Sequence, residues 1–105
     1  MAGVNPYHQQ CIRHFDANIK ILHGATTISE GYQGVVHMGG VRQTVQVIKI
    51  FNKNVLRAGD EDTIRFKFRY GVELIEKGSK LMIREGNTKC LGHITKVYPM
   101  TENPT

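Results

Sequence analysis

The 105-residue sequence predicts a single all-β domain, either a small antiparallel barrel or a sandwich. Apolar and polar residues alternate at period two in two separate stretches, which is typical of strands with one solvated face. Glycine-containing dipeptides suited to tight hairpins separate further stretches rich in Val, Ile and Thr. No segment has helical periodicity of convincing length. Closing such a sheet into a barrel would also remove its exposed edges.

The N-terminal segment, residues 1–14, precedes the first predicted strand and is expected to be a linker or an added lead segment. Asn5 and Pro6 could be the N-cap and first position of one helical turn over residues 5–14, or the segment could be an ordered linker. The domain itself is expected to span residues 15–98. Residues 99–105 are predicted to form a flexible tail.

Strands and turns follow from the apolar pattern and the turn residues. Gly39-Gly40 and Gly86-Asn87 supply the positive φ that two-residue hairpins need, and glycine in the first position suits a type II′ turn. Six strands are expected, over residues 15–21, 32–38, 41–51, 63–70, 80–85 and 88–98. Loops are expected at residues 24–31, 52–62 and 71–79, which contain Gly, Asn, Asp or Ser.

The expected core consists of the inward-facing apolar residues of these strands. Each would contribute roughly 1.5–3 kcal/mol on full burial. Ile48 and Ile50 could replace two core valines if the long strand at 41–51 changes face at a bulge. The candidates are Phe15, Ile19, Ile21, Val45, Val47, Ile64, Phe66, Phe68, Leu81, Ile83, Leu91 and Val97.

The net charge of +5 is unevenly distributed, because residues 63–100 carry the whole basic excess. This asymmetry favours an acidic partner, most often nucleic acid, although mild basicity is also common in proteins that bind nothing acidic. Two widely separated cysteines, no glycosylation sequon and no signal peptide predict a reducing, cytoplasmic setting. No apolar run is long enough to span a membrane, so no membrane partner is expected.

Catalytic and metal-binding chemistry is not predicted for this chain. Cys11 and His14 form one Cys-x-x-His pair, but the second pair that structural zinc needs is missing. The acidic residues 60–62 are expected to form a solvated turn before a strand. No phosphate-binding loop occurs, and residues 52–55 (NKNV) only half resemble a guanine-binding Asn-Lys-x-Asp, because valine stands in place of the aspartate. The chain alone is therefore not expected to be an enzyme or to hold a cofactor.

Arg65, Lys67 and Arg69 lie on one face of a predicted strand, about 7 Å apart, which approximates the phosphate spacing of a nucleic-acid strand. Alternating basic residues are equally typical of any solvated strand face. The spacing therefore leaves both interpretations open.

The hairpin at residues 84–89 is the better candidate for binding nucleic acid. Glycine allows the backbone to approach a sugar-phosphate, while Thr88 offers a donor and Lys89 a charge. The alternative is a plain tight turn. The candidate RNA-binding residues here are Arg84, Glu85, Gly86, Asn87, Thr88 and Lys89.

An apolar pair is expected on the outer surface. Met82 falls between two predicted core positions, so strict alternation places it outside, and Val35 could lie nearby. Neighbouring exposed apolar residues favour a partner surface, although scattered ones are normal.

Several motifs, in order along residues 15–98, resemble the C-terminal (third) barrel domain of elongation-factor-Tu-like translational GTPases. The string REGNTKCLGHITK at residues 84–96 looks like the last hairpin of that domain. Residues 15–17 resemble its opening strand, residues 31–32 the start of its second strand, and residues 58–60 the turn before its fourth strand. Residues 26–29, 32–33, 36–37, 42–44 and 56–57 are most similar to the eukaryotic elongation-factor-like GTP-binding proteins of the first and second type. The chain differs from the bacterial factors at Asn87, where those have arginine.

The resemblance implies a six-stranded antiparallel β-barrel cut from a GTPase whose upstream domain binds GTP and magnesium. Glu85 and Gly86 match hairpin residues that approach the T-stem of aminoacyl-tRNA, and Thr44 matches a third-strand contact. Val35 and Met82 match positions that face the GTPase domain. The implied partners are this GTPase domain, a second barrel domain and tRNA or another RNA, with the ribosome or RNA-surveillance factors beyond them.

Two functions are therefore expected from different classes. The first is an RNA-binding module for the T-arm side of tRNA, in a GTPase linked to translation, ribosome rescue or RNA surveillance. The second is a protein-docking module that senses the nucleotide state of its GTPase domain and recruits a partner without contacting RNA.

Overall fold

A computed structural model describes residues 10–24 and 27–104 and contains, within them, eight β-strands and no helix. The strands are β1 (Gln10–Ile12), β2 (His14–His23), β3 (Gln33–Met38), β4 (Val41–Ile50), β5 (Glu61–Phe68), β6 (Glu73–Ile75), β7 (Lys80–Glu85) and β8 (Thr88–Tyr98). None of the described residues forms a helix that is long and apolar enough to cross a membrane.

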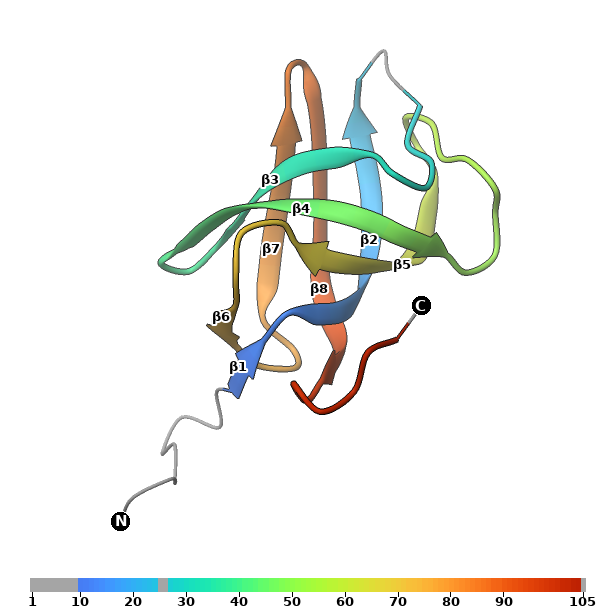
Figure 1. Cartoon of the computed structure of the whole chain (residues 1–105). Coiled ribbons are helices and arrows are strands. Elements are labelled where there is room, and N and C mark those ends of the chain that lie inside the picture. Colours follow the sequence, from blue (N-terminus) through green and yellow to red (C-terminus); the bar gives the residue numbers. More distant parts are fainter. Residues whose placement is uncertain (1–9, 25–26, 105) are drawn as a thin grey trace.

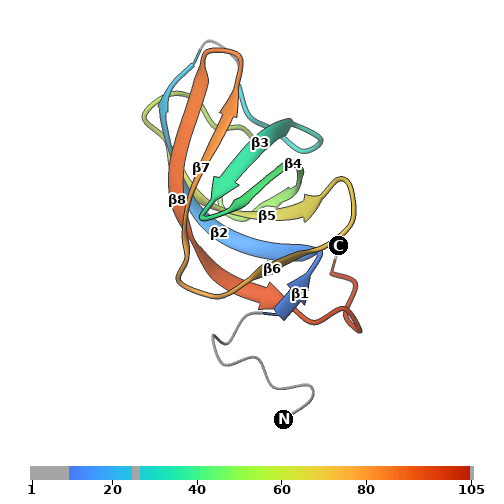
Figure 2. The same cartoon turned by 90° about the vertical axis from the view of Figure 1, so that its left-hand side faces the viewer.

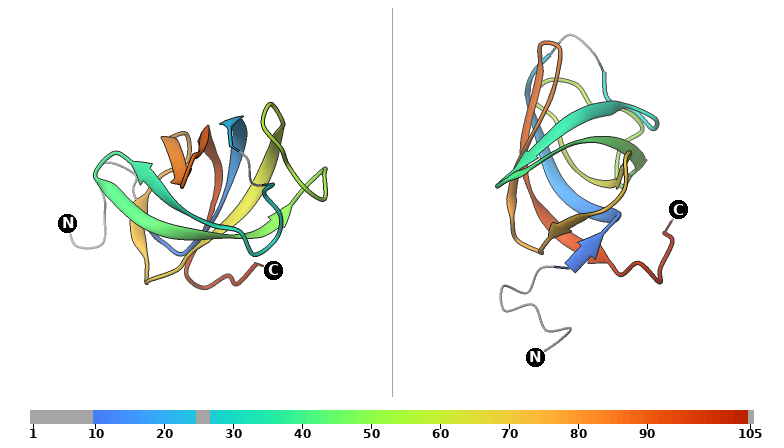
Figure 3. Two further views of the ribbon diagram at one scale, coloured as in Figure 1. Left: turned by 90° about the horizontal axis from the view of Figure 1, so that it is seen from above. Right: turned by 60° about the vertical axis from the view of Figure 1, so that its left-hand side comes forward.

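Six of these strands close into an antiparallel barrel in the order β2-β5-β4-β3-β7-β8. The turn between β7 and β8 stands at the upper end of Figure 1, and β3 and β4 cross these strands at a steep angle (Figures 1 and 2). Seen from above, β4 lies across the barrel from β8 and β2 (Figure 3). The predicted fold, a six-stranded antiparallel barrel, is confirmed.

The two strands outside the barrel, β1 and β6, pair with each other as a small antiparallel sheet. Residues 10–12 are thus extended, and the helical turn considered for residues 5–14 is wrong over this part; its remainder lies outside the described residues. Similarly, β6 interrupts the predicted loop at 71–79. Ile12 and Ile75 are both buried, so the small sheet anchors the entry into β2 to the barrel core.

The predicted core is confirmed except at Leu91, which is 43% exposed, and at Val97, which is only partly buried against it. The β8 register explains the error. Ile94 pairs with Ala17 and Lys96 with Asp16, so one extra residue of β8 forms a bulge between them and reverses which side chains face inward. Alternation counted back from Val97 therefore places Leu91 inside, whereas the inward residue is Cys90, which is fully buried.

A second bulge, in β4 beyond Val47, brings Ile50 into the core while Val45 and Val47 stay buried. The apolar side chain of Ile48 remains half-buried. A bulge in this strand was one of the expectations, but it adds a core residue here and replaces none.

The loops 24–31 and 52–62 hold each other through a bridge between Ile28 and Leu56, whose side chains are both buried. Asp62 is likewise buried, and its carboxylate accepts hydrogen bonds from the backbone amides of Asn52 and Lys53 at 3.1 and 2.9 Å. The expected solvated acidic turn is therefore wrong at Asp62, because this carboxylate fixes the loop before β5.

The described part of the C-terminal segment, residues 99–104, continues beyond β8 without joining a strand. The Glu102 amide donates to the Pro99 carbonyl at 2.8 Å and closes one turn. This segment runs along the end of the barrel that lies opposite the β7–β8 turn (Figure 1).

Candidate functional site

The predicted hairpin forms at the tip of β7 and β8. Glu85 pairs with Thr88, so Gly86 and Asn87 are the two turn residues, and Gly86 has a φ of +59° that favours glycine. The His23 imidazole of β2 donates from Nδ1 to the Asn87 carbonyl at 2.9 Å. The tip is thereby attached to the neighbouring strand.

The hairpin side chains are not equally accessible. Arg84, Glu85 and Asn87 are exposed, and Lys89 is half-exposed. Thr88 is only 2% exposed and packs against Gly24, where an added Cβ would lie 2.6 Å from the threonine Oγ1. The expectation that Thr88 offers its hydroxyl to a ligand is therefore wrong, because this side chain is buried in the barrel.

Strand register places the other predicted residues beside the hairpin. Val35 of β3 pairs with Thr44 of β4 on one side and with Arg84 of β7 on the other. Arg84 in turn pairs with Lys89 of β8. These outward positions form one row across four strands, which we call the upper row.

A parallel row lies two residues further along each strand. His37 pairs with Arg42 and with Met82, and Met82 pairs with Leu91. We call these four residues the lower row. Both rows combine basic and apolar side chains, because every second residue of each strand faces outward.

The β4, β3 and β7 members of the two rows line one groove of about 600 Å³. The groove joins four of the seven residues predicted to bind RNA to the pair predicted to dock a GTPase domain, whereas Asn87, Thr88 and Lys89 lie outside its lining. Its lining is Gln33, Gly34, Val35, His37, Arg42, Thr44, Met82, Arg84, Glu85 and Gly86. The two expected sites are therefore neighbouring parts of a single surface.

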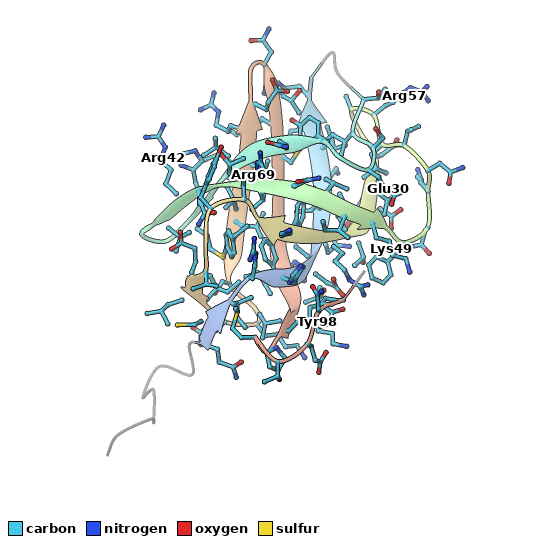
Figure 4. All side chains as sticks on the ribbon, viewed as in Figure 1. Glu30, Arg42, Lys49, Arg57, Arg69 and Tyr98 are labelled. Carbon is cyan, nitrogen blue, oxygen red and sulfur yellow. The ribbon has the colours of Figure 1, made fainter. Side chains whose placement is uncertain are left out.

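Two arginines on the groove walls have no bonding partner within the described residues, and Glu85 is the one carboxylate in the lining. Arg42 and Arg84 are exposed, and neither side chain makes a hydrogen bond or ion pair with another of residues 10–24 and 27–104. Glu85 stands beside the half-buried Tyr32, and burial together with this carboxylate raises the pKa of Tyr32. Figure 4 shows Arg42 projecting on the side of the molecule away from Lys49. The groove can therefore attract an anionic partner.

The three alternating cations at positions 65, 67 and 69, on β5 and just after it, do not belong to this groove. Arg65 Nε donates to Asp16 Oδ1 at 3.0 Å, and Arg69 stacks on Tyr70 with its guanidinium carbon 5.6 Å from the ring centroid. Lys67 lines a different cavity. The three cations that the sequence placed in one row thus have three separate surroundings.

The remaining hydrogen bonds of Arg65 belong to a buried network on the opposite half of the barrel. Its Nη2 donates to the Tyr98 hydroxyl at 2.7 Å, and that hydroxyl donates to Asp16 Oδ2 at 2.6 Å. The guanidinium also lies 5.1 Å from the ring centroids of both Phe51 and Tyr98. Burial and the Asp16 carboxylate raise the pKa of Tyr98, while the hydrogen bond to Asp16 raises that of Arg65.

No group of three His, Cys, Asp or Glu side chains among the described residues is arranged to hold a metal ion. Cys11 is exposed, whereas Cys90 is buried and burial raises the pKa of its thiol to about 11. A thiol with so high a pKa is a poor nucleophile near neutral pH.

The sequence is similar to GTP-binding proteins. It is 46% identical over 87 residues, 83% of the chain, to GTP-binding protein 2 of Mus musculus and equally to that of Homo sapiens. It is 38% identical over 104 residues, 98% of the chain, to GTP-binding protein 1 of Xenopus laevis. No protein-family model matches the chain.

The chain spans only 14–16% of the length of these relatives. The similarity supports a GTPase-related domain, and the barrel found here is consistent with the C-terminal barrel of the elongation-factor-Tu-like GTPases.

Proposed function

We propose that this barrel is an RNA-binding module of a translational-type GTPase and that it holds the T-arm side of aminoacyl-tRNA or of another RNA. The observation that carries the proposal is the groove, which gathers Thr44, Arg84 and Gly86 from separate parts of the sequence beside cations that have no internal partner. RNA duplexes are recognised mainly through phosphates and 2′-hydroxyls, and this surface offers groups for both.

Five of the groove residues have a defined role in this proposal. Arg42 and Arg84 pair with phosphates, and the Thr44 hydroxyl donates to a phosphate oxygen. Gly86 allows the RNA backbone to approach the hairpin, because it has no side chain and the space where its Cβ would lie is open. Glu85 accepts a hydrogen bond from a ribose 2′-hydroxyl, which would distinguish RNA from DNA.

The parent protein would supply the chemistry that this chain lacks. GTP and magnesium would be bound by an upstream GTPase domain, and the barrel would pack on that domain and on a second barrel domain. The names of the relatives support the GTPase part of this proposal. The proposed setting is the cytoplasm, in translation, ribosome rescue or RNA surveillance, with the ribosome or surveillance factors as further partners.

A second candidate function, docking of a protein without RNA, is favoured by Leu91. This residue pairs with Met82 on the outer face and is 43% exposed, so it extends the apolar pair Val35 and Met82 beyond the groove. An apolar strip of this kind would pack against a GTPase domain and sense its nucleotide state.

The shared groove determines which variants separate the two functions. Met82 lines the same groove as Arg84, so Met82→Asp would disturb both an RNA and a docked domain. Leu91 and Lys89 lie outside the groove lining, on β8. Leu91→Ser therefore tests docking, and the double variant Arg84→Glu, Lys89→Glu tests RNA binding.

The experiment is a binding titration of the domain with a tRNA acceptor/T-arm minihelix. We expect the double charge reversal to abolish binding, and Leu91→Ser to leave RNA affinity within about twofold, since it removes no charge. The matched charge control is the double variant Lys77→Glu, Lys80→Glu, at two exposed lysines outside the groove lining. If the double variant bound as tightly as the unchanged domain, the RNA proposal would be wrong.

A further inference from the structure

A second cavity, of about 310 Å³, lies at the barrel end opposite the hairpin, where Tyr98 meets the C-terminal segment (Figure 4). It is distinct from the groove and shares no lining residue with it. Its barrel side is formed by Arg13, His14, Lys67 and Tyr98, and its outer side by Pro99, Met100, Glu102 and Asn103. This volume is at the lower end of the range for small-ligand sites, which begins at about 300 Å³.

The barrel side of the cavity is built on paired strands. His14 of β2 pairs with Lys67 of β5 and with Tyr98 of β8, so the three side chains are direct cross-strand neighbours. The Arg13 carbonyl accepts a hydrogen bond from the Phe68 amide at 2.9 Å, which fixes the backbone beside this row. The lining is therefore rigid on the side that carries the positive charge.

Arg13, which lines the cavity, also carries a buried group without a partner. Its Nε is buried and has no hydrogen-bond partner among the described residues. A buried cationic N–H without an acceptor is costly, at roughly 1–3 kcal/mol or more, so such groups are rare unless a ligand or water satisfies them. Lys67 likewise has no ion-pair partner in residues 10–24 and 27–104.

The pKa of His14 is affected by the positive charges around the cavity. It is 9% exposed, and burial, together with the nearby charges of Lys67, Arg13 and Arg65, lowers the pKa of its imidazole. The imidazole is consequently neutral near pH 7 and able to donate one hydrogen bond. Glu102, on the outer side, is the only lining group of opposite formal charge.

We infer that this cavity binds a phosphate-class oxyanion. The anion accepts from the Arg13 guanidinium and the Lys67 ammonium, with the neutral His14 ring beside it. A guanidinium and an ammonium in the lining of one pocket match the several acceptor oxygens of phosphate better than they match a single-charge halide. The source of the anion is either a free phosphate or phosphate ester, or a phosphodiester of a bound RNA.

The test is a titration of the ¹⁵N-labelled domain with inorganic phosphate at low ionic strength, followed by amide shifts and the His14 ring signals. We expect saturable shifts at residues 12–14, 67 and 98–103, and a rise in the pKa of His14, because a bound anion favours the charged imidazole. Absence of any saturable shift up to about 20 mM phosphate, a very weak affinity, would overturn the inference.

Variants identify the groups responsible. Arg13→Gln and Lys67→Gln should each weaken phosphate binding about tenfold, since each removes a charged hydrogen-bond donor. Glu102→Gln should tighten it, because a like charge leaves the lining. Lys77→Gln is the matched control, and should bind like the unchanged domain. If Arg13→Gln does not fold, Lys67→Gln, a partly exposed strand position, still decides the question: unchanged affinity in that variant would contradict the site.

A competition arm separates the two sources. A short RNA duplex with blocked ends is added to the phosphate-loaded domain. Displacement of phosphate from residues 12–14 and 67 would assign the site to a phosphodiester, and the site would then share its RNA with the groove. Retention of phosphate would assign it to a free phosphate or a phosphate ester, independently of whether the groove binds RNA.

Discussion

The two halves of the barrel use arginine in opposite ways. On the half formed by β8, β2 and β5, Arg65 is held by Asp16 and Tyr98 and covered by two aromatic rings. On the half formed by β4, β3 and β7, Arg42 and Arg84 line a groove that also contains Val35 and Met82. Neither arginine donates a hydrogen bond to another residue in the described part of the chain. Both arrangements come from outward strand positions that look alike in the sequence.

The difference shows that the partners of a cation, more than its strand position, decide its role. The guanidinium of Arg65 bonds to Asp16 of β2 and Tyr98 of β8, so it links these two strands to β5. Arg84 keeps its hydrogen-bonding capacity for a partner outside the domain. We therefore expect changes within the Asp16, Arg65 and Tyr98 network to alter stability, and changes at Arg42 or Arg84 to alter binding.

The largest expected effect is on stability in the first half. Asp16→Ala leaves Arg65 and the Tyr98 hydroxyl without their shared acceptor and should lower the free energy of unfolding by about 3 kcal/mol. Arg84→Ala, the matched change in the groove, should alter it by less than about 0.5 kcal/mol. Urea denaturation measures both. Equal losses of unfolding free energy in the two variants would show that the two halves do not differ in this way.

A second stability contrast concerns backbone packing between β2 and β8. A Cβ at Gly92 would lie 2.0 Å from the Asn18 carbonyl oxygen, so Gly92→Ala must push two strands apart and should cost about 2–3 kcal/mol. At Gly40, in the β3–β4 turn, an added Cβ meets nothing within 4 Å. Gly40→Ala should therefore be close to neutral in thermal unfolding, and a large loss there would contradict this account.

The smallest effect is a pH dependence from His14. Because the pKa of this imidazole is lowered in the folded state, unfolded chains bind a proton more readily between that lowered value and about 6.5. The contribution of neutral His14 to the free energy of unfolding is therefore complete above about pH 6.5, and it is lost as the pH falls below that value. The difference in unfolding free energy between the unchanged domain and His14→Gln, measured from pH 7.5 to 5, isolates it; a difference that does not vary with pH would show that His14 does not titrate in this way.

The barrel strands could be predicted because their apolar alternation and turn residues are local signals. The alternation at Phe66 and Phe68, and the glycine of the Gly86 turn, each point to one structure. The short strands β1 and β6 could not, since three residues carry no periodicity. Leu91 was misplaced because one bulge residue reverses the alternation, and bulges depend on the partner strand.

The candidate site could be predicted only in part. Thr44, Glu85 and Gly86 followed from family resemblance, Arg84 from the charge of the hairpin, and Val35 with Met82 from outward apolarity, whereas Arg42 and His37 of the groove were missed. That the two groups line one groove depends on pairing between β3 and β7, which lie far apart in the sequence. The burial of Thr88 and the hydrogen bond from Tyr98 to Asp16 likewise depend on tertiary contacts, which no local sequence pattern indicates.

The most direct test of the central claim is an NMR titration of the domain with the acceptor/T-arm minihelix at two salt concentrations. We predict amide shifts at Thr44 and residues 84–89. With about three phosphate contacts, binding should weaken roughly 20- to 40-fold between about 50 and 200 mM salt. The claim would be contradicted by shifts confined to the Asp16, Arg65 and Tyr98 half, or by no shifts at the lower salt.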